Sequence, residues 1–203
     1  MRDTRYEDGF TLVELLVALM VVSIIFTAVA TLAYALGAVN DATNDMAEKQ
    51  AQVRYATLRI SELIRHCKLI CGTLGNDLAI WRADDSNYGQ ININELVYIE
   101  KGADSNYLRL CVFPLSATSL VNLSDIKTLA TSGYSVTYVP LIPECNNVEF
   151  QFDVSPPNSK FVSISFDLVE NGVTRRYQIS AALRGWAGNL LSADGQSIVG
   201  DDD

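Results

Sequence analysis

Several patterns that usually signal catalysis or metal binding are scarce or absent in this sequence. His66 is the only histidine, no Cys-x-x-Cys pair occurs, and no glycine-rich phosphate loop follows a predicted strand. A cysteine–histidine nucleophile at Cys67 would also need an orienting group in a cleft, so an exposed imidazole on a helix flank is the simpler interpretation. We therefore expect no enzyme activity, no cofactor and no metal site.

One acidic segment offers the oxygen atoms that calcium prefers. It is Asp84-Asp85-Ser86-Asn87, which lacks the spaced ligands and the terminal glutamate of a known calcium loop. We interpret it as a polar turn.

Positive charge is also lacking. The 203 residues include 15 Lys and Arg against 24 Asp and Glu, which gives a formal net charge of −9. Direct binding to nucleic acid needs clustered basic residues, so we expect no nucleic-acid partner.

A long apolar run near the N-terminus dominates the chain. From Phe10 to Val39 the run contains no proline and a single charged residue, Glu14. A helix of this length measures roughly 45 Å, more than the ~30 Å hydrocarbon core of a bilayer. A secretory signal peptide cut after Ala33-Tyr34-Ala35 is the weaker alternative, because the run exceeds an ordinary signal core. Arg2 and Arg5 precede the run, which favours a cytoplasmic N-terminus.

Glu14 is the residue that a simple membrane anchor does not explain. A carboxylate deep in an apolar helix costs about 2.5 to 3.5 kcal/mol on insertion scales. No Lys or Arg occurs between Thr11 and Glu48, so the same helix supplies no cation. A positive group from another copy of the chain is the remaining candidate.

The segment Gly9-Phe10-Thr11-Leu12-Val13-Glu14-Leu15-Leu16-Val17-Ala18-Leu19 resembles the cleavage and methylation signature of type IV prepilins and pseudopilins. The resemblance implies that a prepilin peptidase cuts between Gly9 and Phe10, and that Phe10 is then N-methylated. It also implies that Glu14 pairs with the α-ammonium of a neighbouring Phe10 during assembly. The leader at residues 1–9 is not net basic, which departs from the family pattern.

The helix is expected to continue beyond the membrane over residues 40–72. This stretch has no proline or glycine until Gly72, a plausible left-handed cap. One face carries apolar residues at helical spacing: Val53, Ala56, Ile60, Leu63, Cys67 and Ile70. A continuous helix from Phe10 to about Cys71 would be roughly 90 Å long.

The stripe needs a covering element, and the downstream sequence predicts one. Alternating segments at 148–154, 162–168 and 177–183, with a hairpin at 95–113, are typical of antiparallel strands. We expect an α+β, pilin-like fold, in which the amphipathic half of the helix packs on one antiparallel sheet over residues 73–185. Residues 186–203 are interpreted as a solvated tail.

The four cysteines are Cys67, Cys71, Cys111 and Cys145. Beyond the membrane the environment is oxidising, so disulfides are the default. Cys67 and Cys71 lie on the predicted helix, and each is expected to reach a different strand cysteine. A direct Cys67–Cys71 bond and a zinc site remain as alternatives.

The order of helix then sheet is also similar to that of minor pilins and pseudopilins. Scattered positions resemble the J-type pseudopilins of type II secretion and the W-type minor pilins: Leu58, Arg59, Leu63, Arg65, Tyr177, Ala182, Leu183 and Arg184. This implies a minor subunit of a type IV pilus or pseudopilus, anchored once in the inner membrane with an extracytoplasmic head. Its implied partners are prepilin peptidase, other pilin subunits and the assembly platform. A membrane-tethered binding protein or adhesin that never polymerises is the alternative.

Overall fold

The computed structural model describes residues 10–74, 77–83, 90–126, 129, 133–185, 189, 191–193 and 197–198. The leader at residues 1–9 and the segment Asp84–Asn87 lie outside the described residues. The chain divides into two units, residues 1–46 and 47–203, which are described in turn.

The first unit consists of the N-terminal part of helix α1, which spans Leu12–His66. This part is long and apolar enough to cross a membrane, with a mean hydropathy of 2.7. Its large side chains are exposed all round the helix, since no other described residue of the unit covers them. The predicted apolar helix is therefore confirmed, and its apolar side chains are left exposed.

In the second unit, α1 buries one face against the sheets. Ala56, Ile60 and Ile64 are fully buried, and Val53 and Leu63 pack beside them. The expected stripe is confirmed up to Leu63, but the helix ends at His66 instead of near Cys71. The reason is strand pairing: the backbone N–H of Lys68 donates to the Trp81 carbonyl at 2.9 Å. Cys71 consequently lies in a strand and not on the helix.

The described residues of the head form three antiparallel sheets, where the sequence predicted one. The largest has the order β1 (Leu69–Leu74), β2 (Asp77–Trp81), β4 (Leu96–Lys101), β5 (Leu108–Val112) and β7 (Thr137–Ile142). The second has the order β10 (Val173–Ala182), β9 (Phe161–Glu170) and β8 (Asn146–Phe152). The smallest pairs β3 (Ile91–Asn92) with β6 (Leu120–Val121), next to the 3₁₀ turn η1 (Ile93–Glu95) and helix α2 (Leu123–Ile126). Strands β4, β5, β8, β9 and β10 match the predicted strands, while β1, β2, β3, β6 and β7 were missed.

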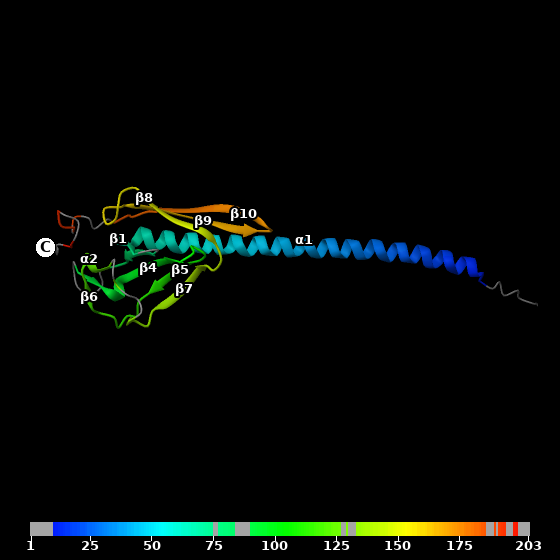
Figure 1. The fold of residues 1–203 in the computed structure, drawn as a ribbon, viewed down its shortest axis with the longest axis horizontal. Helices are drawn as coiled ribbons and strands as arrows, with labels where there is room; N and C mark the ends of the chain where they lie inside the picture. Colours follow the sequence, from blue (N-terminus) through cyan, green and yellow to red (C-terminus); the bar gives the residue numbers. More distant parts are fainter. Residues whose placement is uncertain are drawn as a thin grey trace, which may run out of the picture. The chain divides into compact units, whose positions relative to one another are not determined.

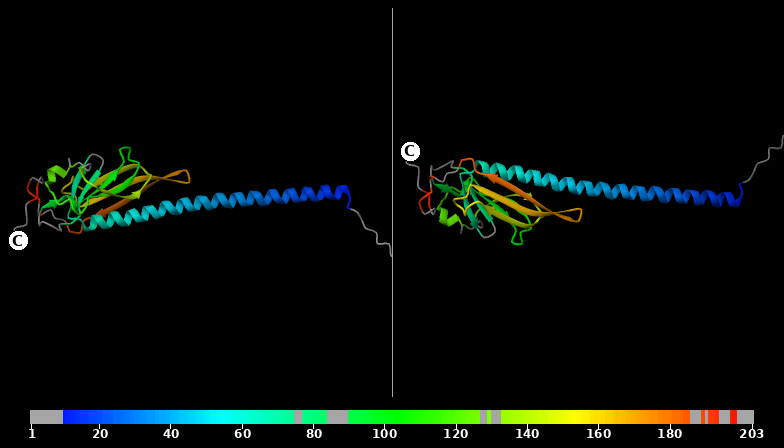
Figure 2. Two further views of the ribbon diagram at one scale, coloured as in Figure 1. Left: turned by 90° about the horizontal axis from the view of Figure 1, so that it is seen from below. Right: turned by 90° about the horizontal axis from the view of Figure 1, so that it is seen from above.

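One core cluster lies where α1 meets both larger sheets. Figure 2 shows the two sheets on one side of the head part of α1. Ile60 from the helix, Ile99 from β4 and Phe166 from β9 are among the residues that this cluster buries completely. The helix stripe therefore closes a core shared by two sheets.

A second cluster covers the opposite face of the five-stranded sheet. It is built around Trp81, Tyr98 and Phe113, and α2 lies against β1 (Figure 1). Leu191 and Ile198 pack against it and form an isolated antiparallel bridge with each other. The expectation of a solvated tail from residue 186 is thus wrong for Leu191 and Ile198, because their apolar side chains extend the second core.

A row of charged residues crosses the five-stranded sheet on the face of the second cluster. Leu78 pairs with Ile99, so the preceding Asp77 and the following Glu100 face each other on adjacent strands. Arg109 pairs with Glu100 and donates from Nε to its carboxylate at 2.6 Å, while its guanidinium lies 3.8 Å from the Tyr138 ring centroid. Burial, followed by the nearby Glu100 charge, raises the pKa of Asp77 to about 6.

This raised pKa predicts a pH-dependent stability. The folded state binds the Asp77 proton more tightly than the unfolded state, whose pKa is 3.8. The stabilisation is complete at low pH and is lost as the pH rises through about 6. Replacing Asp77 by Asn should therefore stabilise the protein more at about pH 8 than at about pH 4.

The measurement is thermal unfolding of the full chain in micelles, followed by the fluorescence of the buried Trp81. Asp104→Asn, in the exposed loop between β4 and β5, is the matched control. An Asp77→Asn effect that is equal at both pH values would contradict the assignment.

Candidate functional site

The start of helix α1 brings together the residues that the sequence singled out. Phe10 is 82 % exposed, and Thr11 directly precedes the first helical residue, Leu12. Gly9, the expected cleavage position, lies outside the described residues. Thr11 therefore occupies the position that caps the helix, one residue after Phe10 and three before Glu14.

Thr11 and Glu14 form a reciprocal capping box. The Glu14 carboxylate accepts hydrogen bonds from the Thr11 backbone N–H at 3.0 Å and from the Thr11 hydroxyl at 2.9 Å. The Glu14 backbone N–H donates in return to the Thr11 hydroxyl at 3.3 Å. The Thr-x-x-Glu spacing is the known sequence signal for this arrangement, and it identifies Thr11 as a residue that the sequence analysis missed.

The capping box gives Glu14 polar partners before any other chain is present. Two local donors reach one carboxylate oxygen, Oε2, and the positive end of the helix dipole lies beside it. Because neither donor carries a full charge, the carboxylate retains its negative charge and can still attract a cation. The helix start can thus hold an acid in apolar surroundings and present it to an ammonium group.

The hydroxyl groups in the apolar run are also satisfied within the helix. Ser23 donates to the Met20 carbonyl at 2.8 Å, and Thr27 donates to the Ser23 carbonyl at 2.8 Å. Thr31 donates to the carbonyls of Thr27 and Ala28. A lipid tail or a neighbouring helix consequently meets no unpaired donor at these positions.

The four cysteines are buried free thiols, so the disulfides expected from the sequence are not formed in this structure. Cys71 lies in β1 and Cys111 in β5, with β2 and β4 between them. Three strand spacings separate them by about 14 Å, too far for a disulfide. Burial raises the pKa of Cys67 to about 12 and that of Cys145 to about 11, so neither is a thiolate at neutral pH.

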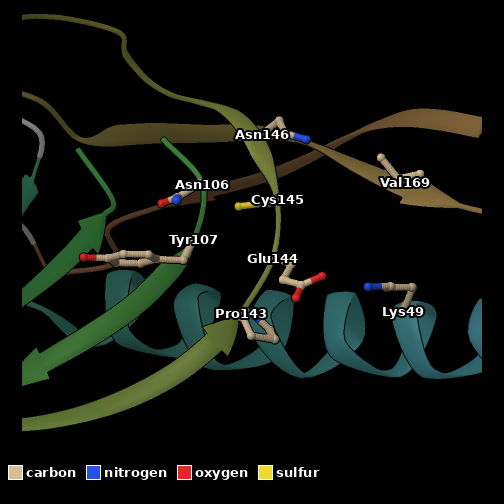
Figure 3. A pocket seen from close by; sticks show the side chains of 8 residues that line it. All are labelled: Lys49, Asn106, Tyr107, Pro143, Glu144, Cys145, Asn146 and Val169. Carbon is tan, nitrogen blue, oxygen red and sulfur yellow. The ribbon is translucent and has the colours of Figure 1, made fainter. Parts of the chain in front are cut away.

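A cavity of about 360 Å³ lies between α1 and the strand ends (Figure 3). It is lined by Lys49, Asn106, Tyr107, Pro143, Glu144, Cys145, Asn146 and Val169. The Glu144 carboxylate points toward Lys49 from the opposite wall in Figure 3. No histidine lines it, and its protonated thiol gives no nucleophile–base pair.

Metal binding finds little support in the described ranges. There, no three His, Cys, Asp or Glu side chains group closely enough to hold an ion. His66 is exposed at the last position of α1.

Comparison with known proteins adds one finding at the helix start. Residues 4–30 match the family described as the prokaryotic N-terminal methylation motif. No curated protein and no solved structure matches the chain. The match covers the residues on both sides of the expected Gly9–Phe10 cut and includes the Thr11–Glu14 capping box.

The capping box predicts a measurable role for the Thr11 hydroxyl. Replacing Thr11 by Val keeps the shape but removes the hydroxyl, which should destabilise the first turn by about 1 kcal/mol. Amide hydrogen exchange at Glu14 should then speed up about fivefold, as measured by NMR on the full chain in micelles. Thr11→Ser, which keeps the hydroxyl, is the control. Equal exchange rates in the Val and Ser variants would show that the hydroxyl caps nothing.

Proposed function

Since the motif at residues 4–30 is characteristic of type IV prepilin-like proteins, we propose that this chain is a minor pilin or pseudopilin. The motif implies processing by prepilin peptidase and pilin-type assembly. In more detail, the chain is a structural subunit, not an enzyme, that is incorporated into a type IV pilus or a type II secretion pseudopilus. The J-type and W-type minor subunits are the subclasses it resembles.

The bare apolar half of α1 supports this proposal best. Its side chains find no cover among the described residues, so folding alone leaves them in contact with solvent. Lipid covers them in the inner membrane, and the helices of other subunits cover them in a filament. A single helix can pass between the two media because both are apolar and its hydroxyls are already bonded.

Glu14 sets the position of a subunit among its neighbours. Cleavage between Gly9 and Phe10 creates an α-ammonium group at Phe10, and Glu14 of an adjacent subunit is the carboxylate that meets it. The capping box keeps that carboxylate at the helix start, close to where the neighbour's N-terminus arrives. An unpaired charge in the filament core is energetically costly, so the favoured position of a subunit is the one that pairs Glu14 with its neighbour's ammonium group.

The proposed orientation rests on the residues before the apolar run. Arg2 and Arg5 precede it, which favours an N-terminus in the cytoplasm and a head outside the inner membrane. This places the Gly9–Phe10 bond at the cytoplasmic face. The head, residues 47–203, is then available to other subunits beyond the membrane.

The first test is the mass of the intact protein purified from a native host with a working prepilin peptidase. We expect a chain that begins at N-methylated Phe10. A chain that still begins at Met1 would refute processing and would favour a membrane-tethered binding protein or adhesin.

The second test separates insertion from assembly. Glu14→Ala should insert into the membrane and be cut, since it removes a charge from the apolar run. Its incorporation into filaments should fall about tenfold or more, because the neighbouring ammonium loses its partner. Glu48→Ala, an exposed acid beyond the apolar run, is the control. Normal filament incorporation of Glu14→Ala would remove the proposed role.

A further inference from the structure

The edges of the two larger sheets differ in how they are protected. A free edge offers amides and carbonyls to a foreign strand, and proteins block such edges with bulges, prolines or covering elements. In the described ranges β1 is bulged between Ile70 and Gly72 and contacts α2. Strand β7 contains Pro140, and β8 is bulged at Asn147, where φ is 52°. Three of the four edges are therefore blocked.

Strand β10 is the fourth edge, and it has no such feature. It pairs with β9 over ten successive residues without a register shift, and it contains neither proline nor glycine. A two-residue turn, Asn171-Gly172, closes the hairpin with positive φ at both positions. The edge is therefore long and regular.

The hairpin geometry decides which amides of β10 face outward. In a two-residue hairpin the closing pair, Glu170 and Val173, is hydrogen-bonded, so every second residue after Val173 points to β9. The alternate residues point to the free edge: Thr174, Arg176, Gln178, Ser180 and Ala182. All five are exposed, and among the described residues no backbone partner is assigned to their amides.

The backbone N–H groups of Leu183 and Arg184 continue the same alternation between β9 and the free edge. Leu183 donates its N–H to the Lys160 carbonyl on the β9 side at 2.9 Å. Arg184, the next outward position, donates its N–H to the Arg65 carbonyl of α1 at 3.2 Å. The end of α1 therefore closes the last outward position, while the positions from Thr174 to Ala182 have no backbone partner in the described part of the chain.

The charge along β10 indicates what kind of segment fits. Residues 173–184 contain three arginines and no acid, in a chain of net charge −9. Arg176 is fixed by Glu149 at 2.7 Å and by Ser165 at 2.9 Å, yet half of its side chain is exposed. Arg175 is similarly held by Glu170 at 3.3 Å. An extended segment with carboxylates on the exposed side matches this edge.

A second copy of the chain fits poorly. Two β10 strands from two copies can pair in an antiparallel ladder only with one head turned end for end against the other, whereas subunits assembled from one membrane share one direction. A copy in the same orientation would have to offer another of its larger-sheet edges, and those described edges are blocked.

We propose that β10 is a strand-addition site for an extended, carboxylate-bearing segment of a different protein. The inference rests on the proposed function, which makes that protein a neighbouring subunit.

The first experiment removes one outward amide. Gln178→Pro deletes an N–H that faces the free edge and leaves the β9 ladder intact, whereas Gln178→Ala changes only the side chain. Co-purification of neighbouring subunits with the full chain from the native host should fall about tenfold for the Pro variant and stay near wild type for the Ala variant. Equal co-purification by both variants overturns the inference. Thermal unfolding of the purified full chains checks that both variants fold.

The second experiment does not depend on the Pro variant folding. A photo-crosslinking residue is placed in turn at Thr174, Gln178 and Ala182 of the full chain in its host, and the crosslinked peptides are identified by mass spectrometry. Strand addition predicts that the three contacts move in order along a single acidic stretch of one subunit. Contacts scattered over several proteins, or no contacts, overturn the inference.

The two proposals fail in different ways. An uncut N-terminus in these samples would remove the proposed function itself. A normal methylated Phe10 together with scattered crosslinks would remove only the strand-addition site.

Discussion

The constraint on which the rest depends is the uncovered apolar surface of α1 between Leu12 and Val39. None of the described residues covers this surface, and its apolar side chains gain free energy where lipid or other helices remove them from water. Every polar group inside the run must then be satisfied by the helix itself. The bonds of Ser23, Thr27 and Thr31 to carbonyls one turn earlier meet this requirement.

The same helix changes its role along its length because its pattern changes. Around Ile60 the apolar residues narrow to one stripe, and two sheets close over that stripe to form a core. The five-stranded sheet is buried on both faces, since α1 lies on one side and α2, β3 and β6 lie with the second cluster on the other. The two core clusters of the described head thus contain no residue of the apolar half.

Sequence reasoning identified the elements whose patterns are unambiguous. The strands β8 to β10 alternate strictly, and the hairpin β4–β5 has a polar loop, so both were predicted. Strand β2 was missed because Leu78 to Trp81 are all buried and show no alternation. Strand β1 was assigned to the helix because the apolar spacing through Cys67 and Ile70 suits both structures, and only pairing with β2 decides between them. The single-sheet prediction failed because periodicity does not show how strands partition between sheets.

The capping box changes the energetics of an acidic residue at the start of an apolar helix. Considered as a lone charge, Glu14 would resist entry into the membrane and would need a foreign cation at once. Because Thr11 gives Glu14 two hydrogen-bond donors, the free-energy cost of a carboxylate without a cationic partner is smaller. Neither donor neutralises the charge, however, so a free ammonium remains the better partner in a medium of low dielectric constant. The hydrogen bonds from Thr11 to Glu14 can therefore give way to a bond from an ammonium group of another subunit. Insertion into the membrane followed by assembly would require such a replacement.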